Sequence, residues 1–91
     1  MKSTRVTIIN PTGLHARPAS EFVSKAKQFS SRITIKNAAQ EASVPVNAKS
    51  IIHLLTLGLS QGAVAEITAE GEDESAAVET LKQLVESGLG E

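Results

Sequence analysis

Apolar and polar residues alternate in three stretches of the chain, 4–9, 32–36 and 63–69. Alternation with a period of two predicts a strand with one buried face. A weaker candidate strand covers residues 42–46, and Pro45 within it predicts an edge position, because proline cannot donate a ladder hydrogen bond. The inward positions of the three clear strands are Val6, Ile8, Ile33, Ile35, Ala65, Ile67 and Ala69.

Helical periodicity predicts three further elements. The first helix runs from about 16 to 28, and the second is short, with Ser50 as candidate N-cap and Gly58 near its end. The acidic run 72–74 suits the first turn of a third helix, and the tail 87–91 is expected to fray. Their apolar positions are Ala19, Phe22, Val23 and Ala26, then Ile51, Ile52, Leu54, Leu55 and Leu57, then Val78, Leu81, Leu84 and Val85.

The predicted order of elements is βαββαβα, in one domain spanning residues 1–91. Helices on one face of an antiparallel sheet would bury the alternating strand residues and leave the other sheet face in water. We therefore expect an α+β fold of two layers, an open-faced β-sandwich. The sequence contains no internal repeat and no low-complexity segment.

Composition narrows the range of functions. With 91 residues and 41% hydrophobic content, the chain can build one core but no deep cavity as well, so we expect a site on the surface. A net charge of −1, with no basic block and only two aromatic residues, argues against nucleic-acid binding. The lack of cysteine, signal-peptide pattern and apolar run of membrane-spanning length favours a soluble, cytoplasmic protein with no membrane insertion. Two histidines without further ligands make a metal site improbable.

The candidate chemistry lies in Gly13-Leu14-His15-Ala16-Arg17-Pro18-Ala19-Ser20, between the first strand and the first helix. His15 falls at the helix start, and Pro18 in the first turn tolerates its missing N–H there. The helix N-terminus offers N–H groups and a positive dipole end to a phosphate. Arg17 can neutralise charge on a transferred phosphoryl group, and Gly13 permits a tight turn. A single histidine in such a place is more often a cap or a solvated residue, and only the combination indicates a nucleophile.

The segment GLHARPAS resembles the active-site signature of the HPr family of phosphocarrier proteins. NAKSIIHLLTLGLSQG at 47–62 and AEITAEGEDESAAVETL at 65–81 are similar to other parts of that family, so the resemblance covers nearly the whole chain. It implies a sheet with strand order 1-4-2-3 and three helices on one face, and the edge position of the third strand agrees with Pro45.

The resemblance also implies a function. Enzyme I of the bacterial sugar phosphotransferase system would phosphorylate His15 on Nδ1, His15 would pass the group to a sugar-specific enzyme IIA, and Arg17 would assist. Thr12 could hold the imidazole through its hydroxyl, with Gly13, Ala16 and Pro18 as supporting residues. The chain would be an intermediate in phosphoryl transfer instead of a stand-alone enzyme, without cofactor, and a monomer.

The resemblance further implies that Ser50 is a regulatory serine, phosphorylated by an HPr kinase and read by a catabolite-control regulator. From the residues alone, Ser50 is an ordinary N-cap, and a phosphate there is compatible with capping. The expected docking residues for partner proteins are Ile51, Ile52, Leu55, Ala19 and Ser20. The alternative for the isoleucines and the leucine is that they complete the core. His53 is expected on the surface.

Besides a small-molecule-binding α/β sandwich without phosphoryl transfer, whose pocket a chain of this length would struggle to form, two other functions stay open. One is a phosphocarrier of the nitrogen branch, which resembles HPr but serves a regulatory relay. The other is a purely regulatory module in which only Ser50 is modified. Between Ile33 and Ser50 the chain is about four residues longer than common HPr sequences, so we expect the second hairpin or its exit to be extended.

Overall fold

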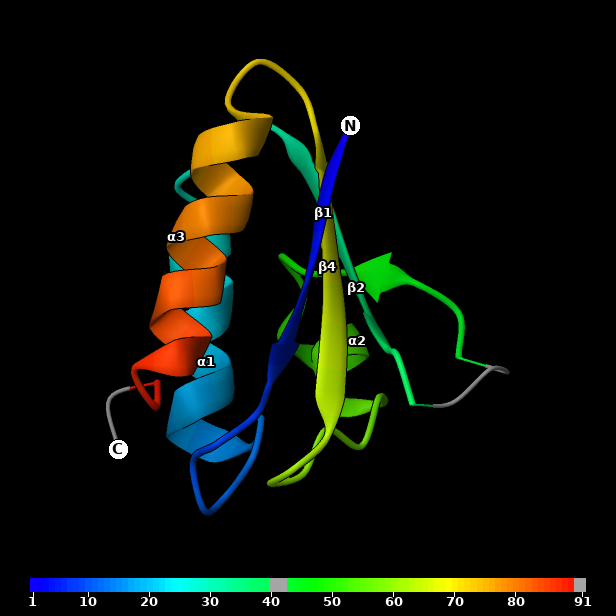
Figure 1. Cartoon of the computed structure of the whole chain (residues 1–91), viewed down its shortest axis with the longest axis vertical. Coiled ribbons are helices and arrows are strands. Elements are labelled where there is room, and N and C mark those ends of the chain that lie inside the picture. Colours follow the sequence, from blue (N-terminus) through cyan, green and yellow to red (C-terminus); the bar gives the residue numbers. More distant parts are fainter. Residues whose placement is uncertain (40–42, 90–91) are drawn as a thin grey trace.

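The structure, a computed structural model, describes residues 1–39 and 43–89 (Figure 1). Its elements follow the predicted order βαββαβα. They are β1 (Lys2–Thr7), α1 (Ala16–Ala26), β2 (Arg32–Asn37), β3 (Val46–Asn47), α2 (Ile51–Leu55), β4 (Val64–Glu70) and α3 (Glu74–Glu86).

The four strands form one antiparallel sheet in the order β1-β4-β2-β3, which confirms the expected topology. β4 lies between β1 and β2, with Val6 opposite Ala65 and Ile35 opposite Ile67. Among residues 1–39 and 43–89, β3 pairs with β2 alone and forms an edge, where the missing N–H of a nearby proline breaks no ladder hydrogen bond.

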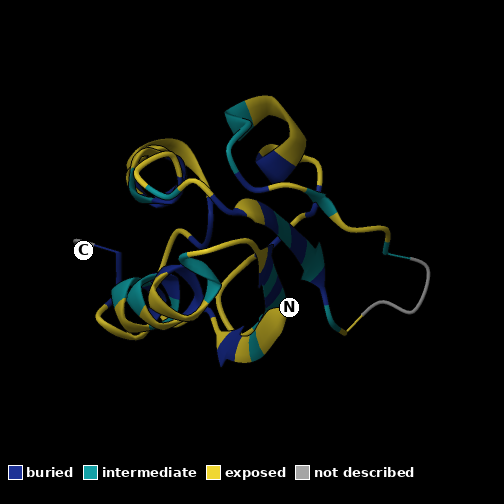
Figure 2. Cartoon of the chain, turned by 90° about the horizontal axis from the view of Figure 1, so that it is seen from above, coloured by how far each residue is buried: buried dark blue, intermediate teal, exposed yellow. Residues whose placement is uncertain are grey.

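The core lies between the sheet and the helices. Ile33, Ile35, Ala65, Ile67 and Ala69 alternate inward as predicted, each at most 1% exposed. In Figure 2 the exposed residues of the helices lie on their outer sides, and the buried residues face the interior. The opposite sheet face carries two polar pairs, Ser3 with Thr68 and Lys36 with Glu66. The expected two-layer architecture is therefore confirmed.

The third strand is shorter than predicted. Within the described residues it covers only Val46 and Asn47, so Pro45 precedes the strand instead of lying within it. Because proline has no N–H to donate to the ladder, the pairing of β3 with β2 begins at Val46, one residue after Pro45. Residue 42, where the strand was expected to begin, lies outside the described residues, as does part of the extended hairpin.

Residues 87–89, the described part of the tail that was expected to fray, are ordered by contacts with α3 and the core. Leu89 is 1% exposed and belongs to the core, with its backbone N–H donating to the Leu84 carbonyl at 3.1 Å. Gly88, with a φ of 89°, turns the chain back after the C-cap Ser87, and a left-handed glycine there is a common way to end a helix. The prediction failed because the glycines on either side of Leu89 indicate the end of a helix, although Leu89 continues the spacing of Leu81 and Val85.

The ends of the two later helices also differ from the prediction. α3 begins at Glu74 with Asp73 as N-cap, so only Glu74 of the acidic run lies in the first turn. The Asp73 carboxylate instead accepts hydrogen bonds from the backbone N–H groups of Ser30 and Ser31, at 2.8 and 2.9 Å. α2 ends at Leu55, so Leu57 lies beyond the helix and is buried.

Candidate functional site

His15 is the N-cap residue of α1, as the sequence predicted. Its φ of −132° and ψ of 158° are extended, and its side chain makes no capping hydrogen bond. The imidazole is exposed. Pro18 lies in the first helical turn, where its missing N–H costs nothing, and its ring is buried. The site is therefore an exposed histidine at a helix N-terminus whose position a proline fixes.

The chain reaches His15 through a compact turn. The Gly13 N–H donates to the Asn10 carbonyl at 3.1 Å, and the Asn10 side-chain amide donates to the Gly13 carbonyl at 2.7 Å. The next N–H, of Leu14, donates to the Leu59 carbonyl at 2.8 Å. Leu14 itself is 1% exposed and belongs to the core. His15 thus extends from a turn that is tied to a distant segment of the chain.

Gly13 is needed in this turn for two separate reasons. Its φ of +67° lies in the left-handed region, which disfavours residues with a Cβ. A Cβ at this position would also collide with the Leu59 carbonyl oxygen and lie 2.7 Å from Cα of Ser60. The expectation of a tight turn at Gly13 is confirmed, and the close approach of the 59–60 backbone adds to it.

Four of the predicted site residues around His15 face solvent. Thr12, Ala16, Arg17 and Ser20 are all exposed, whereas Ala19 is 0% exposed and packs in the core. The prediction of a docking contact through Ala19 is therefore wrong, because its methyl group lies on the inner face of α1 and is covered by the core. Ala16 has a φ of 51°, a left-handed conformation that costs a residue with a Cβ about 1–2 kcal/mol. Backbone strain thus lies directly after His15.

The second predicted site lies on α2, which packs beside α1. Ser50 is its N-cap and accepts a hydrogen bond from the His53 N–H at 3.5 Å, a long bond. Ile52 is 73% exposed and Leu55 40% exposed, while Ile51 is half-buried against the core. We call these three residues the α2 patch. Both readings of the patch therefore apply, since Ile51 completes the core and Ile52 and Leu55 offer apolar surface.

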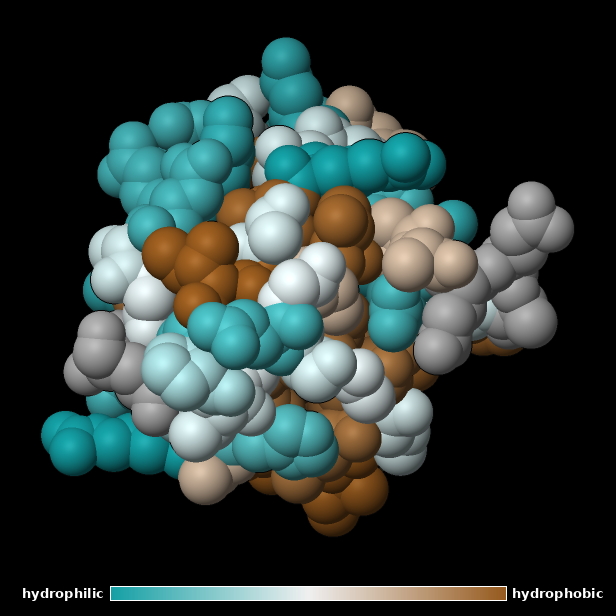
Figure 3. Space-filling model, turned by 60° about the horizontal axis from the view of Figure 1, so that its bottom comes forward, coloured by the Kyte–Doolittle hydropathy of each residue, from teal (hydrophilic) through white to brown (hydrophobic). Residues whose placement is uncertain are grey.

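Figure 1 places the turn after β1 and the loop before β4 at the same end of the molecule. Figure 3 turns that end forward and shows apolar side chains interspersed with polar ones on a rounded surface. Such a surface suits contact with another protein more than enclosure of a small ligand. It agrees with the expectation of a surface site.

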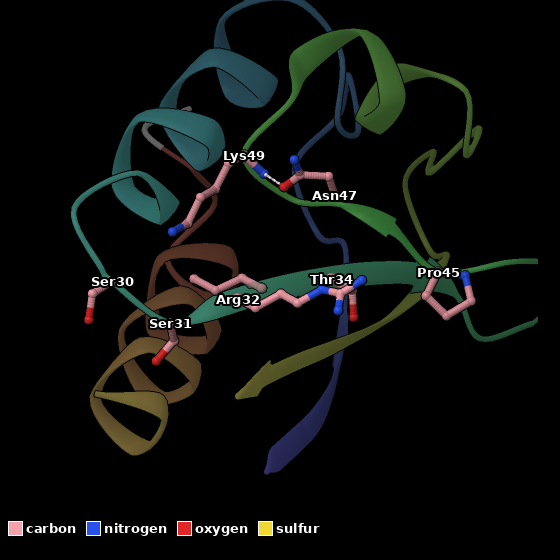
Figure 4. Close-up of a pocket in the computed structure, with 8 residues that line it drawn as sticks. Ser30, Ser31, Arg32, Thr34, Pro45, Asn47 and Lys49 are labelled. Carbon is pink, nitrogen blue, oxygen red and sulfur yellow. Dashed lines mark hydrogen bonds between the residues drawn. The ribbon is translucent and has the colours of Figure 1, made fainter. Parts of the chain in front are cut away.

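The structure also has a hollow of about 400 Å³, shown in Figure 4. Arg32 and Thr34 of β2 line it together with Asn47 of β3 and Lys49, whose backbone N–H donates to the Asn47 side chain at 2.9 Å. None of the predicted site residues lines it. Within residues 1–39 and 43–89 there is also no cluster of three or more side chains that could hold a metal ion. In the same part of the chain, no helix is long and apolar enough to cross a membrane.

Comparison with known proteins decides the family. A family model described as "PTS HPr component phosphorylation site" matches residues 2–87. The chain belongs to the HPr family of phosphocarrier proteins. The phosphocarrier protein HPr of Haemophilus influenzae is 49% identical over 85 residues, which cover 93% of this chain and 95% of that protein. A multiphosphoryl transfer protein of the same organism is 45% identical over 85 residues, and there the match spans only 17% of its length. HPr-like sequence therefore also occurs as a part of larger proteins.

Solved structures agree. HPr of Thermoanaerobacter tengcongensis is 47% identical, with a TM-score of 0.91 over 100% of this chain and 98% of that one. A second structure of HPr from that organism, described as a dimer, has a TM-score of 0.75 over 100% of both chains. HPr of Bacillus anthracis is 37% identical, with a TM-score of 0.83 over 92% of this chain and 95% of that one. The open-faced sandwich and the HPr resemblance are both confirmed.

One feature of the site was not anticipated from the sequence. Asn10 is not among the predicted site residues, yet it is 2% exposed and its side chain donates a hydrogen bond within the turn that leads into His15. The only signal was an asparagine directly after an alternating strand, a position where side chains commonly bond to nearby backbone. That signal does not distinguish a buried side chain from a solvated one.

Proposed function

We propose that the chain carries a phosphoryl group on Nδ1 of His15, receiving it from enzyme I and passing it to a sugar-specific enzyme IIA in the cytoplasm. The observation that carries the proposal is the exposed imidazole at the N-cap of the 11-residue helix α1. A capping side chain would normally bond to the first turn, but the imidazole makes no such bond. The N–H groups of that turn remain for a phosphate instead.

The transfer step needs one nitrogen with a lone pair. Neutral imidazole supplies it, because one of its two ring nitrogens carries no proton. The lone pair forms the new N–P bond of His15 while the bond from phosphorus to enzyme I breaks, and that electron pair stays with enzyme I. In the second step His15 is the leaving group, and its nitrogen takes the pair back as enzyme IIA is phosphorylated.

We assign Arg17 to the charge that accumulates on the phosphoryl oxygens. Its side chain is exposed on the first turn of α1, two residues from His15. The two ion pairs that the described residues form involve other groups. A guanidinium can bind two phosphoryl oxygens at once, and a charge-assisted bond of this kind is stronger than a neutral one.

The α2 patch is the proposed contact for both partners. It lies on the helix that packs beside α1, and Ile52 and Leu55 expose apolar surface. Ser50, half-buried at the start of that helix, is the proposed regulatory serine. A phosphate on its Oγ would add negative charge next to the patch, weakening docking or creating a site for a catabolite-control regulator. An HPr kinase is the enzyme we propose for that modification.

We also propose that residues 1–91 act as one carrier domain and as a monomer, because a single docking surface must serve several partners in turn. The family match over residues 2–87 and the common core support one domain. Sedimentation at the concentration used for transfer assays tests the monomer. A dimer that covers the α2 patch would contradict it.

The deciding experiment is incubation with enzyme I, magnesium and radiolabelled phosphoenolpyruvate. We expect an acid-labile phosphoryl group on the wild-type chain and none on His15→Ala. Equal labelling of both proteins would refute the proposal. Labelling of His15 followed by transfer only to a nitrogen-branch enzyme IIA would support the alternative relay, and labelling of Ser50 alone would support the purely regulatory module.

A further inference from the structure

The peptide unit between Gly13 and Leu14 is held at both ends. Its carbonyl accepts a hydrogen bond from the Asn10 side-chain amide at 2.7 Å, and its N–H donates to the Leu59 carbonyl at 2.8 Å. Asn10 is only 2% exposed, so water hardly competes for its bond. The next residue that the chain exposes after this peptide unit is His15.

Gly13 explains why this clamp, the pair of hydrogen bonds on the Gly13–Leu14 peptide unit, is useful. The packing against Leu59 and Ser60 leaves no room for a Cβ, so this position requires glycine. Glycine, however, adopts positive and negative φ with similar ease, and the peptide unit that follows it can rotate at low cost. Rotation of the Gly13–Leu14 unit would reverse its carbonyl and its N–H and would break both bonds. The clamp removes the freedom that glycine introduces.

The side chain of Asn10 is specific for this task. Its backbone carbonyl also accepts a bond, from the Gly13 N–H at 3.1 Å, but any residue at position 10 could supply that carbonyl. Only a side chain with a donor of the right length reaches the Gly13 carbonyl oxygen. Loss of that donor would leave a buried carbonyl with one partner fewer.

We infer that Asn10 is a positioning residue for phosphoryl transfer at His15. Its side-chain amide fixes the orientation of the Gly13–Leu14 peptide unit and thereby the direction in which the imidazole points from the N-cap of α1. The inference rests on the proposed role of His15. Asn10 does not touch the phosphoryl group, and its effect passes through the backbone. It therefore changes the rate of transfer within the complex and leaves partner docking through the α2 patch intact.

The test compares three variants. Asn10→Ala removes the amide, and Asn10→Asp keeps nearly the same shape but places an oxygen instead of an N–H against the Gly13 carbonyl. Ser31→Ala is the matched control: Ser31 is 1% exposed, its hydroxyl donates to Asp73, and it precedes β2 at the end of the sheet away from the turn. The free energy of unfolding is measured for all three, so that losses of stability can be compared.

The readout is single-turnover transfer from phosphorylated enzyme I over a range of carrier concentrations. For Asn10→Ala we expect the saturating rate to fall about tenfold or more while the half-saturating concentration changes less than about twofold. Ser31→Ala should alter neither value. Hydrogen exchange of the Leu14 N–H should become faster in Asn10→Ala, because the clamped peptide gains freedom.

Three results would overturn the inference. One is a wild-type saturating rate in a folded Asn10→Ala chain, and another is an equal fall in Ser31→Ala at equal loss of stability. The third is a rise in half-saturating concentration alone, which would place Asn10 in docking. If Asn10→Asp does not fold, Asn10→Ala still decides. A wild-type chain that accepts no phosphate on His15 would instead refute the proposed function, a result that these three do not resemble.

Discussion

Replacement of Gly13 by alanine tests whether the backbone at 59–60 sets the turn before His15. Two costs apply at this position. An alanine in the left-handed region costs about 1–2 kcal/mol, and the collision of its Cβ with Leu59 and Ser60 adds about 1–3 kcal/mol of overpacking. The expected loss in the free energy of unfolding is therefore about 2–5 kcal/mol.

Gly58 provides a matched control. Its φ of +62° is close to the +67° of Gly13, but a Cβ built on it meets nothing within 4 Å. Gly58→Ala therefore carries only the conformational cost of about 1–2 kcal/mol. The restriction that alanine places on the unfolded chain is the same for both variants and cancels in the comparison.

The assay is urea unfolding of both variants at neutral pH, together with the rate of phosphoryl transfer from enzyme I. We expect Gly13→Ala to lose at least about 1 kcal/mol more than Gly58→Ala and to transfer more slowly. Equal losses in the two variants would refute the reasoning, since they would show that the 59–60 backbone moves away at no cost. A full transfer rate in a destabilised Gly13→Ala chain would show that the turn does not position His15.

Three further predictions follow from exposure and charge. Arg17→Ala should slow transfer by about 10- to 100-fold with unchanged urea unfolding, because Arg17 is exposed; a large loss of stability would show that it packs in the fold. Leu89→Ala should lower the free energy of unfolding by about 2–4 kcal/mol because Leu89 is 1% exposed, and Leu55→Ala should lower it much less because Leu55 is 40% exposed. Equal urea midpoints for the two variants would contradict the burial of Leu89. The Ser31 hydroxyl and the Ser30 N–H lower the pKa of Asp73 from its ordinary 3.8 to about 2. Asp73 therefore adds stability that is complete above about pH 4 and is lost as the pH falls through about 2. Asp73→Asn should flatten the dependence of the free energy of unfolding on pH over that window. An unchanged pH dependence would contradict the hydrogen bonds from Ser30 and Ser31 to Asp73.

Periodicity predicted the elements of this fold because each strand buries one face. Residues 33–35 and 65–69 alternate with no exception, so both strand type and inward face could be assigned from sequence. Two kinds of feature escaped. Pro45 showed that the third strand lies at an edge but not how little of it pairs, because pairing depends on β2. Leu89 looked like part of a frayed tail because glycines flank it, although it lies four residues after the buried Val85 and is itself buried.

The residues of the site show the same division between features that the local sequence predicts and features that depend on distant parts of the chain. His15 and Pro18 could be placed from sequence because the start of a helix is a local property of a few residues. The direction in which His15 points is not local, since it depends on Leu59, 44 positions later in the sequence, whose carbonyl holds the Leu14 N–H at 2.8 Å. Leu59 follows α2, the helix that carries the α2 patch, and the same segment also holds the chain just after β1 through the bond from the Gly62 N–H to the Ile8 carbonyl at 2.7 Å. A partner that binds the α2 patch would therefore contact a helix whose following segment, 59–62, is joined by backbone hydrogen bonds to the end of β1 and to the turn before the histidine.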